Sequence, residues 1–247
     1  GIKYIWTERL TNIIGQGVSL SPKAVFNIFD PACPVDSLKT MLKTVAKIIV
    51  SFAGSEKYDY FKGNDLLIVS ELRDKQRIYE FVRFNNYFKS PENGDSFEEL
   101  YYLISPRVLT KLKQSGGYAV VYVHLGKNYN LQSADAVKTV NALKNLKMEN
   151  ESGNIYVDST SKVLEYYLTH KHLNWSWKSD NDKCIITVHS VDDPVNGTYV
   201  PSLQQLSNIT FYVSYPHIVE LYCGSEKVQE YRQNPEDHTG MRSITIV

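Results

Sequence analysis

The stretch GGYAVVYVHLG, residues 116 to 126, decides how the first two thirds of the chain are interpreted. Its two glycines end a helical pattern, and the β-branched and aromatic run from Tyr118 to His124 predicts a buried strand. The helix before it is expected to begin at Ser105-Pro106, because a serine N-cap followed by proline is typical of a first turn. His124 is then the last residue of the predicted strand.

Helical and strand patterns alternate on the carboxyl side of this stretch. Ser133 is a suitable N-cap for a helix in which Ala136, Val140 and Leu143 follow i, i+4, i+7 spacing. The run NIYVD, residues 154 to 158, predicts another strand, and a further helical pattern follows it. Strands that alternate with helices favour a parallel arrangement with right-handed crossovers. We therefore expect an α/β layer in this part of the chain.

More strands are predicted on the amino-terminal side. DLLIV (65–69) and RIYEFVRF (77–84) are strand-like, and the polar joint between them is typical of a hairpin turn. Ile2 to Trp6 also predicts a strand. The segment from Asp36 to Phe52 is expected to start as a helix and to change into a strand, since its end, KIIVSFA, is β-branched and apolar.

Beyond residue 173 the pattern consists of short strands joined by turn-rich pieces. The runs LNWSW, CIITVHSV, NITFYVS, IVELYCG and RSITIV show no helix-length period. They predict a small all-β, sandwich-like addition to the α/β part. Cys184 and Cys223 lie in two of these strands. They are able to pair if the protein is exported, and buried free thiols are an equal alternative.

Composition excludes some classes of partner. The chain has 27 basic and 27 acidic side chains, so no net charge recruits nucleic acid or an anionic membrane. No segment has the ~18 uncharged apolar residues of a membrane span. We therefore expect neither nucleic-acid binding nor a membrane span.

Several polar or aromatic residues stand at the ends of predicted strands. His124 is expected at the carboxyl end of a parallel strand, where α/β folds place their chemistry, and an imidazole there is able to transfer protons near neutral pH. The alternative is a histidine that only caps the strand. Trp6, and Arg83 with Asn85 and Asn86, are expected either to bind hydroxyls or a carboxylate or to anchor a loop.

Other histidines and common motifs give no further site. His170 and His172 lie near the end of a predicted helix, where side chains two residues apart point in different directions, so they are not expected to share a metal. The acidic pair Asp192-Asp193 is interpreted as part of a turn. The sequence lacks the common nucleotide-binding, hydrolase and zinc-protease motifs.

Four stretches together resemble a known family. GIKYIWT, LRDKQRIYEFVRFNN, ISPRVLTKLKQSGG leading into YAVVYVHLG, and GNIYVDSTSKVLEYY resemble the carboxyl-terminal part of polysaccharide deacetylase-like proteins, the NodB-type carbohydrate esterases. The resemblance covers roughly residues 1 to 175. It implies a distorted (β/α) barrel that removes acetyl groups from polysaccharides with a divalent metal. It also implies that His124 is the catalytic acid of a Leu-x-His motif, which reads Tyr-Val-His here, with Tyr122 in place of leucine.

The chain departs from the family at the metal site. The family's paired aspartates and His-xxx-His ligands have no counterpart in this sequence, and Arg83 matches the family's Arg-xxxx-Pro element only in character. The chain thus resembles the later half of such a domain. A divalent metal, zinc by preference, is expected only if an amino-terminal segment or another polypeptide supplies the ligands. No metal ligand is assigned within the chain itself.

These observations lead to one interpretation and one alternative. The fold is expected to be α/β, a partial or distorted (β/α) barrel over residues 1–175 followed by a β-rich domain over residues 176–247. The protein is expected to be a portion of a metal-dependent polysaccharide deacetylase, with His124 as catalytic acid and Trp6, Arg83 and Asn85 in substrate binding. The alternative is a non-catalytic carbohydrate-binding or scaffold protein. The expected partners are a polysaccharide or oligosaccharide and an amino-terminal fragment of the same protein, and the expected location is extracellular or in the cell envelope.

Overall fold

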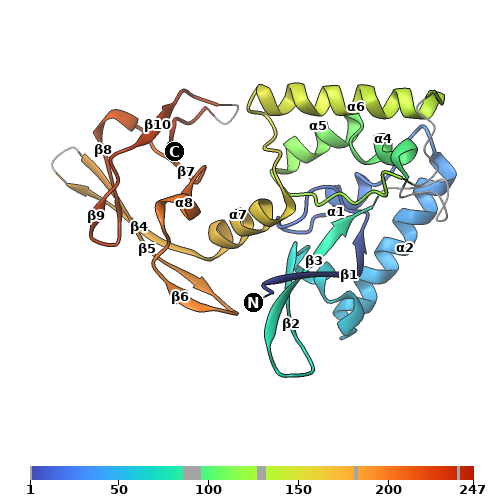
Figure 1. The fold of residues 1–247 in the computed structure, drawn as a ribbon, viewed down its shortest axis with the longest axis horizontal. Coiled ribbons are helices and arrows are strands. Elements are labelled where there is room, and N and C mark those ends of the chain that lie inside the picture. Colours follow the sequence, from blue (N-terminus) through green and yellow to red (C-terminus); the bar gives the residue numbers. More distant parts are fainter. Residues whose placement is uncertain (1, 86–95, 127–131, 181–182, 238–239) are drawn as a thin grey trace. The chain divides into compact units, whose positions relative to one another are not determined.

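A computed structural model of the chain describes residues 2–85, 96–126, 132–180, 183–237 and 240–247 (Figure 1). The chain divides into two compact units, unit 1 from Gly1 to Thr160 and unit 2 from Ser161 to Val247. The sequence-based division was placed at residues 175 and 176, which lie inside a strand of unit 2. The fold is mixed α/β, with helices concentrated in unit 1 and most strands in unit 2.

The sheet of unit 1 has three strands in the order β1-β3-β2. β1 (Tyr4–Thr11) runs parallel to β3 (Arg77–Phe84), and β2 (Leu67–Glu71) runs antiparallel to β3. The predicted strands at 65–69 and 77–84 and the hairpin between them are therefore confirmed. The described strands close no barrel, so the partial (β/α) barrel implied by the resemblance is not confirmed.

The stretch after Gly117 is extended but is not a regular strand, which corrects the sequence-based expectation. It touches three different neighbours through single bridges, an antiparallel one from Tyr118 to Gln16 and parallel ones from Val121 to Phe84 and from His124 to Ser96. β3 ends at Phe84, so the extended stretch meets only the last residue of β3 and forms no longer ladder with it. Two of the three bridges are parallel, and the predicted parallel strand is not formed.

Helices α5 (Pro106–Ser115) and α6 (Ala134–Glu151) begin where the sequence predicts. Ser105 and Ser133 cap them, because their Oγ atoms accept hydrogen bonds from backbone N–H groups three residues on. Gly116 ends α5 in a left-handed conformation, with φ of 63°.

The buried face of α6 differs from the expected one. Ala136, Thr139 and Ala142 are buried, whereas Val140 and Leu143 are exposed. Small side chains let this helix approach its neighbours closely, and the longer apolar ones remain outside. The i, i+4, i+7 pattern that starts at Ala136 therefore gave the correct helix and the wrong face.

Residues 154–158 form no strand, which corrects another expectation. The backbone N–H of Ile155 donates to the carbonyl of Glu149, and that of Val157 donates to Oδ1 of Asn150. The segment is thus tied to the end of α6 and pairs with no strand. The alternation of strand and helix predicted from Ser105 onward therefore yields helices joined by extended segments.

Helix α2 (Pro34–Phe52) is continuous, although its second half was expected to be a strand. Its final turn is closed by a hydrogen bond from the N–H of Ala53 to the carbonyl of Ile49. The other helices of unit 1 are short: α1 (Pro22–Phe26), α3 (Tyr60–Gly63), α4 (Leu100–Leu103), and the 3₁₀ turns η1 (Glu56–Tyr58) and η2 (Phe97–Glu99).

Two hydrophobic clusters stabilise unit 1. One lies beside β3 and α3 and contains Ile13, Ile28, Tyr60, Phe61 and Val82. The other joins α4, α5 and α6 to the extended stretch, whose Ala119, Val121 and Val123 pack against it. Since side chains alternate along an extended backbone, Tyr122 and His124 lie on the opposite side of the stretch.

Unit 2 begins with α7 (Thr160–His172), which leads directly into strands. One sheet has the order β4-β5-β8-β9, with β6 paired to β5, and a second sheet has the order β10-β11-β7. Buried residues of both sheets form one hydrophobic cluster, as expected for a sandwich-like arrangement. The strand bounds are β4 (Leu173–Asp180), β5 (Lys183–Asp193), β6 (Gly197–Tyr199), β7 (Thr210–Tyr212), β8 (Val219–Cys223), β9 (Glu226–Lys227), β10 (Tyr231–Asn234) and β11 (Ser243–Ile246).

Two short helical turns interrupt the strands of unit 2, α8 (Leu203–Leu206) and η3 (Pro216–Ile218), and neither was predicted. The sheet register also decides the state of the cysteines. Cys184 pairs with Val219 and Cys223 pairs with Val188, so the two thiols lie four residues apart along neighbouring strands, roughly 13 Å. A disulfide needs Cα atoms within about 7 Å. Both thiols are therefore free, and burial raises the pKa of each.

Leu221 in β8 provides a test of the unit 2 core. Its side chain is fully buried in the cluster shared by the two sheets. We expect Leu221→Ala to lower the free energy of unfolding by about 2–5 kcal/mol, because it leaves a cavity. Urea denaturation followed by circular dichroism measures this change. Leu203→Ala is the matched control, since Leu203 is half exposed, and equal losses for both variants would contradict the assigned core.

Candidate functional site

Three separate parts of unit 1 converge on one cluster of side chains. β1 contributes Trp6, β3 contributes Arg83 one residue before its end, and the extended stretch contributes Tyr122 and His124. Trp6 pairs with Phe81 in the parallel register, and Arg83 lies two residues further on the same face of β3. We call these four residues the Trp6 cluster.

The guanidinium of Arg83 lies over two aromatic rings at once. Its central carbon is 4.6 Å from the ring centroid of Trp6 and 4.6 Å from that of Tyr122. The two rings lie 5.8 Å apart and are inclined by 31°. One terminal nitrogen, Nη2, donates a hydrogen bond of 3.1 Å to the carbonyl oxygen of Thr7. A cation this close to two ring faces is attracted by both, and the bond to β1 fixes its position.

His124 joins the cluster through Tyr122. The hydroxyl of Tyr122 lies 2.8 Å from Nε2 of His124, within hydrogen-bond distance, and the two rings meet edge to face with centroids 4.9 Å apart. Residues 122 and 124 share one side of the extended stretch, so this contact follows from local geometry. It orients the imidazole relative to Arg83, which lies over the same tyrosine ring.

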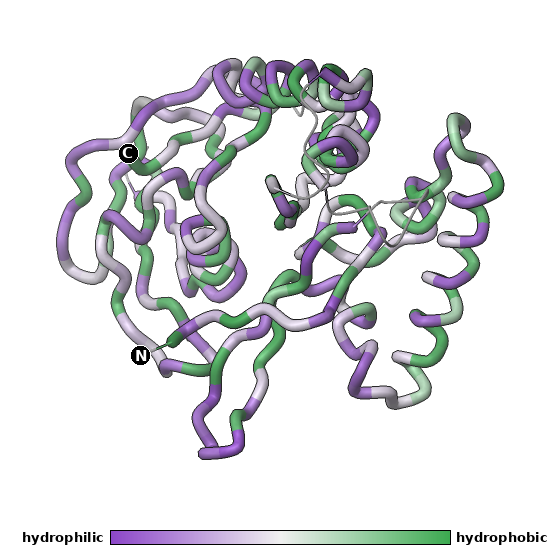
Figure 2. The backbone as a smooth tube through the Cα atoms, turned by 45° about the vertical axis from the view of Figure 1, so that its right-hand side comes forward, coloured by the Kyte–Doolittle hydropathy of each residue, from purple (hydrophilic) through white to green (hydrophobic). Residues whose placement is uncertain are grey.

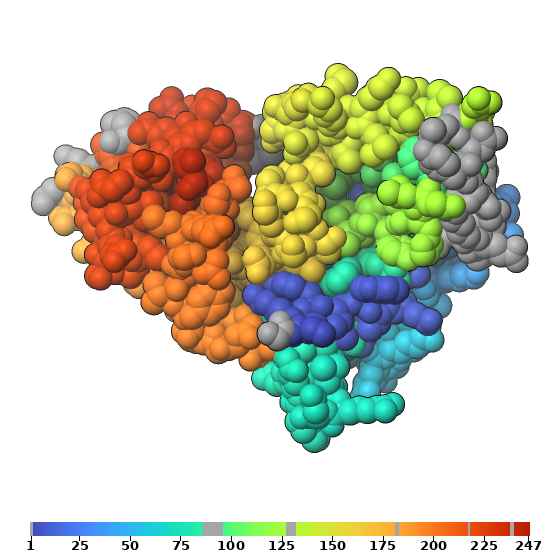
Figure 3. Space-filling view, viewed as in Figure 1, coloured from blue at the N-terminus to red at the C-terminus, as the bar shows by residue number. Residues whose placement is uncertain are grey.

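Burial within the cluster is graded. Arg83 is 8% exposed, Tyr122 is partly buried, and Trp6 is 58% exposed, while His124 is also exposed. The amino-terminal strand runs along the surface of unit 1, as the dark blue band in Figure 3 shows. The cluster therefore presents an indole face and an imidazole to solvent above a buried cation. Flat apolar faces next to directional polar groups are typical of sites that bind polar ligands with apolar faces.

A polar network supports β1 just beyond Trp6. Nε of Arg9 donates to Glu80 and Nη1 donates to Asp59, each over 2.6 Å, and the Thr7 hydroxyl donates to Glu80 over 3.4 Å. Burial alone would lower the pKa of Arg9, but Glu80 and Asp59 outweigh it, so the pKa is raised. These contacts hold β1 against β3 where the register shifts between Trp6 and Leu10.

Three of the four residues predicted for the site thus come together. Asn85 contributes through its backbone, whose N–H donates to the carbonyl of Thr11 over 2.8 Å and whose carbonyl accepts from Nδ2 of Asn12. These bonds tie the end of β3 to the end of β1. Asn86 lies outside the described residues.

Sequence reasoning assigned no role to Tyr122, which links Arg83 to His124. Tyr122 was noted only as the residue that stands in place of the leucine of the Leu-x-His motif. The alternation of an extended segment does predict that residues 122 and 124 share a face. The approach of Trp6 and Arg83 to that face depends on contacts between distant segments, which no local pattern encodes.

The remaining polar candidates lie in unit 2, where the described ones are held in separate local contacts. The rings of His170 and Tyr166 are stacked 6.1 Å apart, and burial lowers the pKa of both His170 and His172. Nε2 of His189 lies 2.7 Å from Oγ of Ser176. Asp192 and Asp193 are the last residues of β5 and were expected to lie in a turn. The turn follows them, and Asp193 accepts hydrogen bonds from the N–H groups of residues 195 and 196 within it. His238 lies outside the described residues.

The described residues contain no group of three or more His, Cys, Asp or Glu side chains that could hold a metal ion. They therefore do not fit a complete zinc site, whose ligands would have to come from elsewhere. Within the same residues, no helix is long and apolar enough to cross a membrane. Comparison of the chain with protein-family models, with curated proteins and with solved structures finds no match.

Arg83 is the residue to test first. We expect Arg83→Ala to lower the free energy of unfolding by about 1–3 kcal/mol, because both ring contacts and the bond to Thr7 are lost. Arg83→Lys should lose less, since it keeps the charge without the planar group. Urea denaturation measures both. Arg73→Ala is the control, because Arg73 lies in the exposed hairpin turn. A loss for Arg83→Ala no larger than the control's would contradict the structural role of the cation.

Proposed function

We propose that unit 1 binds a carbohydrate at the Trp6 cluster. The observation that carries the proposal is the exposed indole of Trp6, held in place by Arg83 4.6 Å from its ring centroid. The apolar CH face of a sugar ring stacks on an indole, and a ring that is already fixed loses little entropy on binding. The resemblance to carbohydrate esterases, noted from the sequence, favours the same ligand class.

The neighbours of Trp6 supply groups for sugar hydroxyls. Tyr122 and His124 offer a hydroxyl and an imidazole at the exposed edge of the cluster. Each is able to donate or to accept a hydrogen bond. This suits a sugar hydroxyl, which can itself be the donor or the acceptor. The expected ligand is a polysaccharide or oligosaccharide, and such a ligand is consistent with a location in the cell envelope or outside the cell.

Binding is tested with oligosaccharides of acetylated and free amino sugars, measured by calorimetry. We expect Trp6→Ala to weaken binding by about 10- to 100-fold, because the stacking surface is removed. Trp177→Ala is the matched control, since Trp177 is a similarly exposed tryptophan in unit 2. Failure of the unaltered chain to bind any of these sugars would refute the proposal. Equal weakening by both variants would move the site away from Trp6.

A second candidate function is favoured by the position of His124. Its exposed imidazole, with Nε2 oriented by Tyr122, could act as the general acid of a polysaccharide deacetylase, the role that the resemblance implies. A proton on this ring would pass to the departing amine or alkoxide. The metal ligands of such an enzyme would lie outside the described residues, so no step through a metal is derived from this chain.

Zinc content and acetate release from an acetylated glycan test the second candidate. If the chain, alone or supplemented with an amino-terminal segment, releases acetate, His124→Ala should abolish the release because no acid remains. Tyr122→Phe should reduce it, since the imidazole loses its orienting contact. Full activity of His124→Ala would exclude the proposed acid. A chain that binds sugar but holds no metal and releases no acetate supports binding alone.

A further inference from the structure

The strongest unexplained feature lies on the other side of the unit 1 sheet from the Trp6 cluster, along α2. Seven apolar side chains of this 19-residue helix are exposed, with exposed fractions between 37% and 66%. One of them, Val50, lies on the lysine side of the helix, and the other six form a single row. Their spacing alternates strictly between three and four residues. We call them the α2 stripe: Val35, Leu38, Leu42, Val45, Ile49 and Phe52. Figure 2 shows the helix on one side of unit 1 with hydrophobic residues recurring turn by turn.

An ordinary surface helix turns its apolar side inward, whereas α2 leaves most of its large apolar side chains exposed. Its fully buried residues are the small polar Ser37, Thr44 and Ser51. The hydroxyls of Thr44 and Ser51 donate to carbonyls of the same helix, and that of Ser37 lies 3.2 Å from the carbonyls of both Pro34 and Asp30. Met41 and Ile48 are partly buried and pack against the cluster that contains Val82. The helix thus packs on unit 1 through small polar residues and two larger apolar ones, and leaves the stripe outside.

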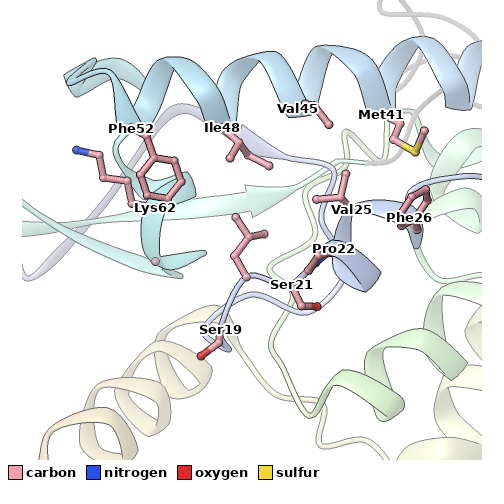
Figure 4. Close-up of a pocket in the computed structure, with 12 residues that line it drawn as sticks. Ser19, Ser21, Pro22, Val25, Phe26, Met41, Val45, Ile48, Phe52 and Lys62 are labelled. Atoms are coloured by element: carbon pink, nitrogen blue, oxygen red, sulfur yellow. The ribbon is translucent and has the colours of Figure 1, made fainter.

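An apolar groove of about 680 Å³ extends this surface. Figure 4 shows Val45 and Phe52 of the stripe on one wall, and Pro22, Val25 and Phe26 on the other. Phe26 is itself exposed. The stripe and the groove therefore form one continuous apolar surface about 28 Å long, the length of a 19-residue helix.

The spacing of the stripe identifies the kind of partner that fits it. Apolar residues at alternating steps of three and four are the seam positions of a coiled coil, whose side chains insert between those of a second helix. The order of three- and four-residue steps is also the same from Val35 to Phe52 as from Phe52 to Val35. A second α2 helix in the opposite direction therefore places Val35 opposite Phe52, Leu38 opposite Ile49, and Leu42 opposite Val45.

Area agrees with this partner. The exposed parts of the stripe side chains amount to roughly 600 Å², and Phe26 with the groove wall brings the surface to about 800 Å². A standard-size interface buries about 800 Å² on each partner. One α2 surface on each of two copies is therefore enough for a specific dimer.

The charges of α2 also allow this pairing. Lys39, Lys43 and Lys47 lie about 90° to 170° around the helix from the middle of the stripe. Two copies joined through their stripes thus keep most of these lysines apart. On a helix immersed in a membrane surface, by contrast, cations flank the apolar face and reach the anionic headgroups. Lys43 and Lys47 point away from that position.

We propose that α2 is a homodimer interface, in which the α2 stripes of two copies pair antiparallel about a two-fold axis. Such an interface is isologous, since the same surface serves both copies. Antiparallel helices also bring opposite ends of their dipoles together. The proposal is independent of carbohydrate binding, because the Trp6 cluster and the stripe share no residue.

Sedimentation of the full chain over a range of concentrations tests the dimer. We expect the unaltered chain to reach twice its monomer mass, and Leu42→Asp and Ile49→Asp each to raise the dissociation constant at least about 100-fold. Both residues are exposed, so the circular dichroism spectrum should be unchanged. The unfolding midpoint should match that of the unaltered chain at concentrations where both are monomeric, and should fall below it where the unaltered chain is a dimer. Val137→Asp is the control, because Val137 is an exposed valine on α6.

Three outcomes would overturn the proposal. They are a chain that is monomeric at every concentration, a dimer that Leu42→Asp and Ile49→Asp leave intact, and a monomer that binds phosphatidylglycerol vesicles only while the stripe is apolar. The last would assign the stripe to a membrane surface. Orientation is tested in a Cys33→Ser background, where Val35→Cys mixed with Phe52→Cys should give a mixed disulfide. Val35→Cys alone should give none, and a self-linked Val35→Cys dimer would refute the antiparallel pairing.

Discussion

The parallel pairing of β1 with β3 is the constraint on which unit 1 depends. It brings Trp6 beside Arg83 and lets the guanidinium bond to the carbonyl of Thr7. Further along β1, where the register shifts, the same pairing lets Nε of Arg9 donate a hydrogen bond to Glu80 of β3. Without this register, the cation would lose its anchor on β1 and the extended stretch would meet no indole.

Arg83 then transmits this constraint to the surface. Because it is nearly buried and lies over two rings, its charge attracts both ring faces with little screening by water. Tyr122 is held at one side of the cation and His124 is held by Tyr122. The nearly buried Arg83 thus fixes the positions of the exposed residues Trp6 and His124.

Local signals in the sequence predicted the elements better than their arrangement. Ser105, Gly116 and Ser133 marked helix ends correctly, because caps depend only on neighbouring backbone groups. Residues 118–124 and 154–158 were predicted as strands from composition. A strand also needs a partner edge, which β3 and the end of α6 do not provide. The KIIVSFA run was predicted as a strand for the same reason and is helical throughout.

In the candidate site, too, individual residues could be predicted from the sequence, whereas their arrangement could not. Trp6, Arg83 and His124 were selected because they were expected at strand ends. Trp6 lies inside β1 and His124 ends no regular strand, yet the structure brings the three together. Their mutual distances depend on the β1–β3 register, which joins residues about seventy positions apart and leaves no trace in any short window. Tyr122 was passed over because its importance lies in what it connects. The exposed stripe of α2 was also not foreseen, since an apolar period alone does not say which way a helix faces.

The distance in sequence between β1 and β3 also bears on how the chain folds. The hairpin of β2 and β3 closes a short loop, whereas pairing Tyr4 with Tyr79 closes one of 75 residues at a larger entropic cost. Contacts of high sequence separation slow folding, so β1 is expected to dock after the hairpin has formed. The Trp6 cluster would then form only after the hairpin, once the amino-terminal strand has docked on β3.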